Sequence, residues 1–561
     1  MQPEGKEKRI GVFICRCGGN ISDYVRVEEV AEALRGEPGV VVSEVHTFTC
    51  SEAAQSEIMA HIREKGLEGV VIASCSPKLH QGTFRNMARQ AGLNPYQYVQ
   101  VNIREQCSWV HPHDPEGATA KAIRLVRAGV ERARRARALT PVVVEVVPQA
   151  AVIGAGLAGL QAALALSELG ITVHLLEKTE APGGHLRNLP LVGEDLLSGL
   201  LEEVSRRSNI KLHLKTQVLS RAGGPGQYRL GIQKEGAEEE LEVGAFIVAA
   251  GFAAYRPQEG EYGYGWPGVL TLGEYFRWLK EQDREPFFEG RPVERVAFIY
   301  CVGMRQSQGP HSYCARFCCP AALRAGRLGA EKGLRFQYHL FRDIRAYGVF
   351  EEDYRRLREA GAFFIRFAEK EPPQVEKAEE GLRVRVKDLL TGKKELEIPV
   401  DLVVLVTGGV PEPQGPLAES LKLPLSADGF LAEVHPKLKP VETLFPGIYL
   451  AGGASSPKTL EETVASALAA SAKAASLFLA GKLELEPRVI EVLEEKCDRC
   501  GKCLEVCPFG ALKLPEEGPV QVEEALCKGE GACVPVCPQK ALQVKGYEHE
   551  TMEAVIGRLA S

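Results

Sequence analysis

The sequence predicts a multidomain α/β protein that ends in a small cysteine-rich domain. At 561 residues the chain is too long for a single hydrophobic core. Apolar runs of strand length alternate with helical stretches as far as about residue 481. The sixteen cysteines fall into three groups, and seven of them lie between Cys497 and Cys537. Three groups of cysteines suggest three sites.

The composition is that of a soluble globular protein and argues against nucleic-acid-binding and membrane proteins. Hydrophobic residues make up 45% of the chain and charged residues 25%, as in soluble globular proteins, and a formal charge of -6 predicts no nucleic-acid partner. The apolar start is too short for a signal peptide, and glycines interrupt the most apolar region, 150–169, so we expect no membrane span. We therefore expect a cytoplasmic protein, in which clustered cysteines favour metal ligation over disulfides.

The first domain, 1–140, has the alternation of a small α/β unit and closes with a helix over 117–139. That helix carries six arginines, which indicate either a solvated face or a docking surface for an acidic partner. Five cysteines are dispersed through the domain: Cys15, Cys17, Cys50, Cys75 and Cys107.

A dinucleotide fingerprint follows. An apolar strand leads into the turn Gly154, Gly156 and Gly159, then a helix and a second strand that ends at Glu177-Lys178. These glycines permit a tight turn, approach of a pyrophosphate and close helix packing, while the helix N-terminus attracts phosphate. The acidic residue is placed to accept hydrogen bonds from ribose hydroxyls. The pattern predicts an FAD site.

Three later segments match an FAD fold of the thioredoxin-reductase type, with two nucleotide-binding domains. The sequence has a glycine pair after the second strand and two later strand-turn segments, but no Asp at the end of the last one, where a ribitol contact is usual. The FAD domain is expected over 141–295 and 351–481. Its further candidate residues are Gly183, Gly184, Ala250, Gly251, Gly452, Gly453 and Ala454.

The expected second fingerprint, for NAD(P)H, is missing. A strand is present at 295–302, but Cys301 stands where the first glycine belongs, and no glycine triplet follows. Four cysteines occur within nineteen residues instead, which favours a 4Fe-4S cluster over buried apolar cysteines. The segment 296–350 is thus expected to bind a cluster through Cys301, Cys314, Cys318 and Cys319, so that electrons reach FAD without a bound nicotinamide.

The segment 484–561 reads as a bacterial-type ferredoxin domain with two clusters, because it contains an internal repeat of about thirty residues. In such repeats the fourth cysteine ligates the other cluster. One site is therefore predicted from Cys497, Cys500, Cys503 and Cys537, and the other from Cys507, Cys527 and Cys533.

The second repeat has Glu530 where a cysteine is expected. The second cluster then has either a carboxylate as its fourth ligand or no fourth ligand, which could leave a 3Fe-4S centre.

The whole chain resembles HdrA, the FAD-bearing component of heterodisulfide reductase, in a shorter form without the inserted ferredoxin domain. The resemblance rests on GVFICRCGGNI, VVIASCSPKLHQGTFR, VNIREQCSWVH, the FAD fingerprint, CVG with YCARFCC, AGGASSPKTLEETVASALA and the ferredoxin tail. It implies a further cluster in the first domain, held by Cys17, Cys50, Cys75 and Cys107, with Cys15 as a competing candidate, and about four clusters in all.

The resemblance also implies the function. We expect an oxidoreductase component that exchanges electrons between FAD and clusters, with electron bifurcation or confurcation, as a homodimer within a larger complex. Expected partners are other heterodisulfide-reductase-like subunits, a hydrogenase or dehydrogenase module, and ferredoxin. Arg324 is a candidate flavin neighbour on a predicted helix, with surface exposure as the alternative.

Two other functions stay open. The first is a self-sufficient NAD(P)H-dependent FAD oxidoreductase similar to the small subunit of glutamate synthase. The second is a structural scaffold with vestigial clusters. The missing second fingerprint argues against the first of them.

Overall fold

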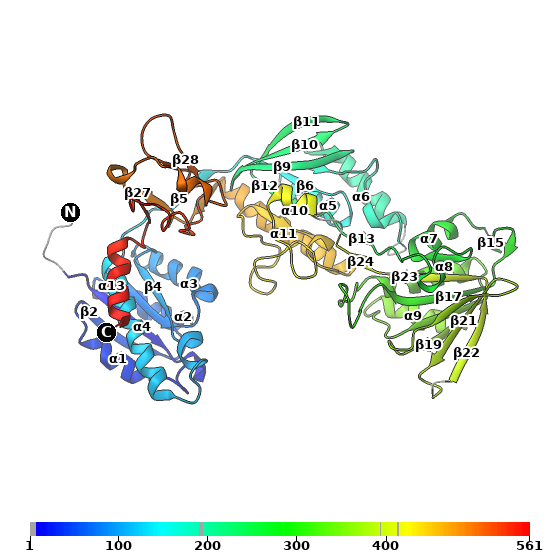
Figure 1. Cartoon of the computed structure of the whole chain (residues 1–561), viewed down its shortest axis with the longest axis horizontal. Helices are drawn as coiled ribbons and strands as arrows, with labels where there is room; N and C mark the ends of the chain where they lie inside the picture. Colours follow the sequence, from blue (N-terminus) through cyan, green and yellow to red (C-terminus); the bar gives the residue numbers. More distant parts are fainter. Residues whose placement is uncertain (1–6, 190–193, 284, 393, 412–414, 561) are drawn as a thin grey trace. The chain divides into compact units, whose positions relative to one another are not determined.

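The computed structural model divides into two compact units (Figure 1). One unit combines Met1–Val143 with Glu484–Ser561, and the other is Val144–Leu483. The two ends of the sequence thus belong to one unit. The structure describes residues 7–189, 194–283, 285–392, 394–411 and 415–560.

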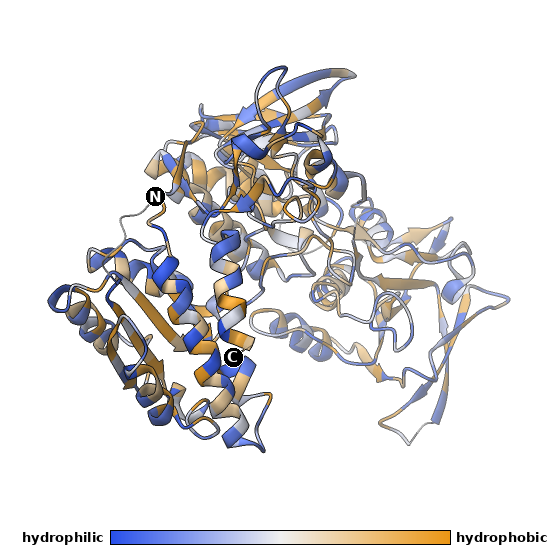
Figure 2. Ribbon diagram, turned by 60° about the vertical axis from the view of Figure 1, so that its left-hand side comes forward, coloured by the Kyte–Doolittle hydropathy of each residue, from blue (hydrophilic) through white to orange (hydrophobic). Residues whose placement is uncertain are grey.

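The first unit contains a parallel sheet of four strands in the order β2-β1-β3-β4. Helices α1 and α4 share one hydrophobic core with the sheet, and α2 and α3 share a second core on its other side. Because both faces of the sheet are covered, the central strands β1 and β3 are buried along their whole length and almost wholly apolar, whereas the outer strands β2 and β4 also carry polar residues; Figure 2 shows the apolar residues of the sheet. The elements are β1 (Ile10–Cys15), α1 (Val27–Arg35), β2 (Val40–His46), α2 (Glu52–Glu64), β3 (Gly69–Ser74), α3 (Pro77–Gln90), β4 (Tyr98–Asn102) and α4 (Pro115–Arg135).

The C-terminal segment of the same unit is built from two small antiparallel ladders, β27 with β30 and β28 with β29. Its core contains few residues, and the cysteines are a large part of it. The elements are β27 (Ile490–Val492), α12 (Lys502–Glu505), β28 (Leu512–Lys513), β29 (Gln521–Val522), β30 (Leu542–Val544) and α13 (His549–Ala560).

In the second unit, the nucleotide-binding sheet has the order β25-β12-β6-β7-β8, with all its pairs parallel. Helix α5 connects β6 to β7, and α5 and α11 pack together in the core. A three-stranded antiparallel sheet, β9 to β11, lies in the same domain. The elements are β6 (Gln149–Ile153), α5 (Leu157–Glu168), β7 (Thr172–Leu176), α6 (Glu194–Arg206), β8 (Ile210–His213), β9 (Thr216–Gly224), β10 (Gln227–Lys234), β11 (Ala237–Val243), β12 (Ala245–Val248), α10 (Gly415–Leu421), β25 (Ile448–Leu450) and α11 (Leu460–Ala480).

Helix α11 is long and apolar enough to cross a membrane by length and composition, with 28% of its most apolar stretch buried. It begins with a capping box formed by Thr459 and Glu462. The Ser471 hydroxyl donates to the carbonyl of Ala162 on α5 at 3.3 Å. One face of α11, with Ala467, Ala470, Ala474 and Ala475, is buried in the core of the nucleotide-binding domain.

A second α/β sheet in this unit has the order β14-β23-β17-β18-β19, and a three-stranded sheet, β20 to β22, shares a hydrophobic core with it. Strands on both sides of 296–350 join this sheet, so the second domain is larger than that expected segment and includes residues assigned above to the FAD domain. The elements are β13 (Ala253–Ala254), β14 (Val269–Thr271), α7 (Leu272–Lys280), β17 (Arg295–Val302), α8 (Cys318–Glu331), β18 (Phe336–Phe341), α9 (Phe350–Glu359), β19 (Phe363–Arg366), β20 (Gln374–Lys377), β21 (Leu382–Asp388), β22 (Lys394–Val400), β23 (Leu402–Thr407) and β24 (Gly409–Val410).

Candidate flavin and cluster sites

A cavity of about 1020 Å³ lies beside the glycine turn that follows β6. Its wall is formed by that turn, by residues that follow β7 and β12, and by the start of α11. The carboxyl ends of parallel strands are where α/β sheets bind ligands. The volume is at the upper end of the range for small-molecule sites, which suits a dinucleotide.

The three glycines of the turn have different surroundings. Gly154 has a φ of +103°, and a Cβ there would lie 2.5 Å from the carbonyl oxygen of Ala249. A Cβ on Gly159 would lie 1.7 Å from the carbonyl oxygen of Gly154. Gly156, at the N-terminus of α5, has no atom within 4 Å of such a Cβ and lines the cavity. The first and third glycines therefore serve the fold, whereas Gly156 leaves room for a phosphate near the helix N-terminus.

The Glu177 carboxylate is fixed at the cavity wall. It accepts hydrogen bonds from the backbone N–H of Ala155 and of Thr179, both at 2.9 Å, and from the Thr179 hydroxyl at 2.8 Å. The residue is only 7% exposed, and Lys178 beside it lines the same cavity. Rigid placement of an acceptor at the end of the second strand is what ribose recognition needs.

The other candidate flavin residues occupy the turns around the cavity. Gly184, Ala250, Gly251 and Gly453 line it, whereas Gly183, Gly452 and Ala454 belong to the same turns without lining it. A Cβ on Gly184 would lie 3.2 Å from the Cα of Gly156. The glycine pair thus packs directly against the phosphate turn.

Lys458 is a wall residue that the sequence reasoning missed. It lies two residues before α11, and its ammonium group donates to the hydroxyls of Ser455 and Ser456, each at 2.8 Å. Burial lowers the pKa of Lys458. The spacing of Thr459 and Glu462 in the sequence is that of a capping box, so it could have located the start of α11. Only the folded structure shows that the Lys458 side chain lies in the cavity wall.

Three aromatic rings connect the cavity wall with helix α8. The imidazole of His185 stacks on Phe252 with a centroid distance of 4.2 Å, and Phe252 stacks on Phe317 at 4.8 Å. All three residues line the cavity. Because Phe317 directly precedes Cys318, the cavity wall and the cysteine segment are covalent neighbours.

The cysteines that replace the second fingerprint gather at the end of β17 and the start of α8. Burial and the neighbouring Cys319 raise the pKa of Cys301. A hydrogen bond with Cys319 and burial raise the pKa of Cys318, to which Cys301 and Cys314 also contribute. Four thiols within electrostatic range at a helix N-terminus match the ligand set of a 4Fe-4S cube.

Cationic and N–H groups surround these thiols. The Arg305 guanidinium lies 4.0 Å from the Cys301 sulfur, and the Arg316 backbone N–H donates to the Cys314 sulfur at 3.4 Å. The hydrogen bond with Cys318, with help from Arg305 and Arg345, lowers the pKa of Cys319. Such partners offset the negative charge of an iron-sulfur cluster.

Arg324 lies on α8 and is half-buried, and its Nε has no hydrogen-bond partner. It is not among the residues that line the described cavity. Its role as a flavin neighbour stays a prediction.

The dispersed cysteines of the first domain lie near the carboxyl ends of β1, β3 and β4 and before α2. Cys15 and Cys17 both raise the pKa of Cys50 and of Cys75, after the larger effect of burial, so these four thiols are neighbours. The Arg104 guanidinium lies 3.7 Å from the Cys17 sulfur. Burial raises the pKa of Cys107 to about 11, and the charge that acts on it is Lys121. The structure therefore groups the competing candidate Cys15 with Cys17, Cys50 and Cys75, which the spacing of the cysteines in the sequence did not indicate.

In the C-terminal segment the thiols form two sets. Burial raises the pKa of Cys503, and Cys500, Cys537 and Cys497 add to it. Burial also raises the pKa of Cys533, to about 11, and Cys527, Cys507 and, as the smallest contribution, Cys503 of the other set add to it. Backbone N–H groups donate to three sulfurs: Ala541 to Cys537 at 3.3 Å, Ala511 to Cys507 and Ile490 to Cys527, both at 3.4 Å. This grouping is the crossed arrangement expected from the repeat.

Among the described residues, no group of three or more His, Cys, Asp or Glu side chains is arranged around a single metal ion. A 4Fe-4S cube instead takes one thiolate for each iron, so its ligands need not converge on one point.

Two family models match the chain. Residues 148–288 match the pyridine nucleotide-disulphide oxidoreductase family, and residues 496–547 match the 4Fe-4S dicluster domain family. The first match covers the glycine turn and β6 to β12, and the second covers both repeats of the C-terminal segment.

Two curated relatives match over nearly the whole chain. The second A-type iron-sulfur subunit of the CoB-CoM heterodisulfide reductase of Methanopyrus kandleri is 35% identical, over 91% of this chain and 92% of the relative. The A-type subunit of the H(2):CoB-CoM heterodisulfide,ferredoxin reductase of Methanothermobacter thermautotrophicus is 36% identical, over 92% of each chain. Among solved structures, the thioredoxin reductase of T. acidophilum is similar at 17% identity and a TM-score of 0.42, covering 59% of this chain and 97% of that one.

Proposed function

Because the chain belongs to the HdrA family of heterodisulfide reductases, we propose that it is the electron-bifurcating or confurcating subunit of a heterodisulfide-reductase-like complex. The chain is an oxidoreductase subunit that carries FAD and 4Fe-4S clusters. When bound, FAD supplies the exchange between electron pairs and single electrons. The proposal adds that electrons enter and leave the flavin through clusters and partner proteins.

One observation carries this proposal. Cys301, with a φ of +62°, lies at the end of β17, at the position where a nicotinamide-binding domain has the first glycine of its phosphate-binding turn. Three more thiols gather beside it. Without the glycine triplet of the fingerprint, the backbone cannot approach a pyrophosphate closely there. Thiolates can hold a cluster at the same place, and Phe317 joins that segment to the flavin cavity.

The residues named above divide into two proposed roles. Gly156, Gly184 and the start of α5 would hold the FAD pyrophosphate, Glu177 the ribose, and Lys458 would add a positive charge at the cavity. The proposed cluster ligands are Cys301, Cys314, Cys318 and Cys319 beside the flavin domain, the crossed sets of the C-terminal segment, and Cys17, Cys50, Cys75 and either Cys107 or Cys15 in the first domain.

The partners and location are part of the same proposal. The relative from Methanothermobacter is named for hydrogen, a heterodisulfide and ferredoxin, and we propose comparable partner subunits, a donor hydrogenase or dehydrogenase module, and ferredoxin for this chain. The complex would be cytoplasmic and contain two copies of this chain.

Rapid mixing with reduced nicotinamides tests the proposal. The isolated holoprotein, with FAD and iron reconstituted, should show no prompt bleaching of the flavin by NADH or NADPH, because the second domain lacks the phosphate-binding turn. Dithionite provides the positive control. Prompt bleaching by either nicotinamide would favour the self-sufficient reductase instead.

The substitution Cys314→Ser distinguishes a cluster that transfers electrons from a vestigial cluster in a structural scaffold. We expect loss of iron at that site and of electron flow between partner and flavin, with assembly retained. A variant that still passes electrons at the wild-type rate would indicate a vestigial cluster.

A further inference from the structure

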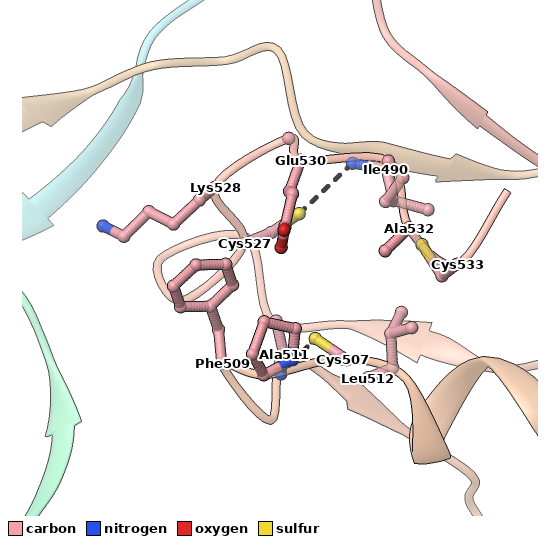
Figure 3. A pocket seen from close by; sticks show the side chains of 13 residues that line it. Ile490, Cys507, Phe509, Ala511, Leu512, Cys527, Lys528, Glu530, Ala532 and Cys533 are labelled. Atoms are coloured by element: carbon pink, nitrogen blue, oxygen red, sulfur yellow. Dashed lines mark hydrogen bonds between the residues drawn. The ribbon is translucent and has the colours of Figure 1, made fainter. Parts of the chain in front are cut away.

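The second cluster site of the C-terminal segment has a carboxylate at its fourth corner. A cavity there is lined by Cys507, Cys527 and Cys533, and Glu530 also lines it. Figure 3 shows the Glu530 carboxylate pointing toward the space between the three sulfurs. In the first repeat the matching position is Cys500, which belongs to the other thiol set.

The loop around Glu530 is shaped for this placement. Glu530 stands between Gly529, with a φ of +64°, and Gly531, with a φ of +82°. A Cβ on Gly529 would lie 2.0 Å from the carbonyl oxygen of Arg488. Only a glycine fits so close to the neighbouring segment. The loop therefore passes tightly along the backbone at Arg488, and the next side chain is turned toward the cavity.

Two of the thiols are already oriented for ligation. The Cys507 sulfur accepts from the Ala511 N–H and the Cys527 sulfur accepts from the Ile490 N–H, each at 3.4 Å. The corresponding bond in the first set goes to Cys537. Both sites thus have backbone N–H groups that donate to cysteine sulfurs. The site with Glu530 differs from the first site in the residue at its fourth position.

We propose that Glu530 ligates the fourth iron of this cluster through a carboxylate oxygen. The inference rests on the proposed function, which assigns a cluster to this cavity. A carboxylate carries the same charge as a thiolate, but it is a harder and weaker ligand in an iron-sulfur site. The iron at this corner is therefore exchangeable. One-electron oxidation by ferricyanide converts the 4Fe-4S form to a 3Fe-4S cluster and releases the fourth iron as Fe²⁺, and Fe²⁺ with dithionite reverses the step.

The test uses the full reconstituted chain and four forms of it: wild type, Glu530→Cys, Glu530→Gln and Glu530→Ala. Each is enriched in ⁵⁷Fe and treated with ferricyanide and a chelator, while iron release, the EPR signal of the oxidised three-iron cluster and the Mössbauer spectrum are followed. Glu505→Gln is the matched control, because Glu505 is an exposed acid of the first repeat that lines no part of this cavity.

We expect wild type to release one iron reversibly, about tenfold faster than Glu530→Cys, and to show one iron site with a distinct Mössbauer shift. The Gln and Ala variants should hold the three-iron cluster before oxidation and should not retain added Fe²⁺. Glu505→Gln should match wild type.

Two results would overturn the inference in different ways. If the Gln and Ala variants matched wild type in iron content and spectra, Glu530 would not be a ligand, although the cluster assignment would stand. If Cys507→Ser changed no iron signal and no form held a second ferredoxin-type cluster, the assignment of a cluster to this cavity would itself fail.

Discussion

At the scale of single residues, the first domain holds five thiols for one proposed cluster. Cys15 and Cys17 lie near Cys50 and Cys75, whereas Cys107 is fully buried and contributes to the core shared by the sheet, α1 and α4. A buried thiol whose pKa is raised to about 11 must lose its proton before it can bind iron.

Single Cys→Ser substitutions separate the two candidates for the fourth ligand. We expect Cys15→Ser or Cys107→Ser, but not both, to lower the iron content by the equivalent of one cluster. Iron analysis and EPR of the reconstituted chain measure this, with Cys17→Ser as the positive control. Equal retention of all iron in both variants would contradict a four-thiolate cluster in this domain.

A substitution at Lys458 tests how much this cation contributes to FAD binding. Replacing it by Gln removes a cation from the wall of the flavin cavity, so we expect FAD binding to weaken by about 1 kcal/mol, roughly fivefold in Kd. Fluorescence titration of the apoprotein with FAD measures the change. Lys458→Arg keeps the charge and should bind within about twofold of wild type; a Gln variant with wild-type affinity would show that the cation does not contact FAD.

At the scale of elements, contacts within the unit account for two of the arginines at and just beyond the end of α4. Arg132 lies over the Tyr547 ring at 4.1 Å, and Arg137 pairs with Glu491 at 3.1 Å and Glu548 at 3.2 Å. Arg558 of α13 in turn lies 3.8 Å from Glu131. Two of the six arginines, Arg132 and Arg137, thus contact the C-terminal segment of their own unit, and the acidic partner considered from the sequence is in part the chain itself.

Strands β7 and β8 carry a pH-sensitive histidine pair. The rings of His174 and His213 stack at 5.2 Å, with 3.1 Å between Nδ1 and Nε2. Burial, with the nearby charges of His213 and Lys211, lowers the pKa of His174 to about 4. Unfolded histidine titrates near pH 6.5, so between about pH 6.5 and 4 the unfolded state binds more protons, and stability falls as the pH drops.

This pair predicts an acid-sensitive flavin domain. Between pH 7 and pH 5 we expect His174 to account for a loss of up to about 2 kcal/mol in the free energy of unfolding. Urea unfolding followed by flavin release measures it at both pH values. In His174→Phe the pH-dependent loss should shrink, while the exposed control His435→Gln should keep it; an unchanged slope in His174→Phe would refute the assignment.

At the scale of the whole molecule, the C-terminal segment differs from the other domains in what stabilises it. The sheets of the nucleotide-binding and first domains have large apolar cores. The described core of the C-terminal segment consists of few residues, and two of its six buried members are Cys503 and Cys533. A segment with so small a core depends on its clusters for stability.

Removal of iron should therefore act locally. Chelation under oxidising conditions is expected to open residues 490–544 to hydrogen exchange, while β1, β3 and β6 stay protected. Hydrogen exchange read by mass spectrometry checks this, with the untreated holoprotein as reference. Equal protection of the C-terminal segment with and without iron would contradict the dependence on clusters.

Local patterns in the sequence determined the flavin turn and the crossed cysteine repeat, because both depend on residues close together in the chain. Gly154, Gly156 and Gly159 are readable from their spacing, and so are Cys301 in place of a glycine and Glu530 in place of a cysteine. The FAD fold and the family followed from these motifs.

Only the tertiary structure decided which distant groups meet. It placed Lys458 in the flavin cavity, brought Cys15 beside Cys50 and Cys75, and extended the second domain through strands on both sides of 296–350. It also joined the N-terminal and C-terminal segments in one unit. These contacts arise from strand order and helix packing between segments far apart in the chain, which residue spacing does not encode.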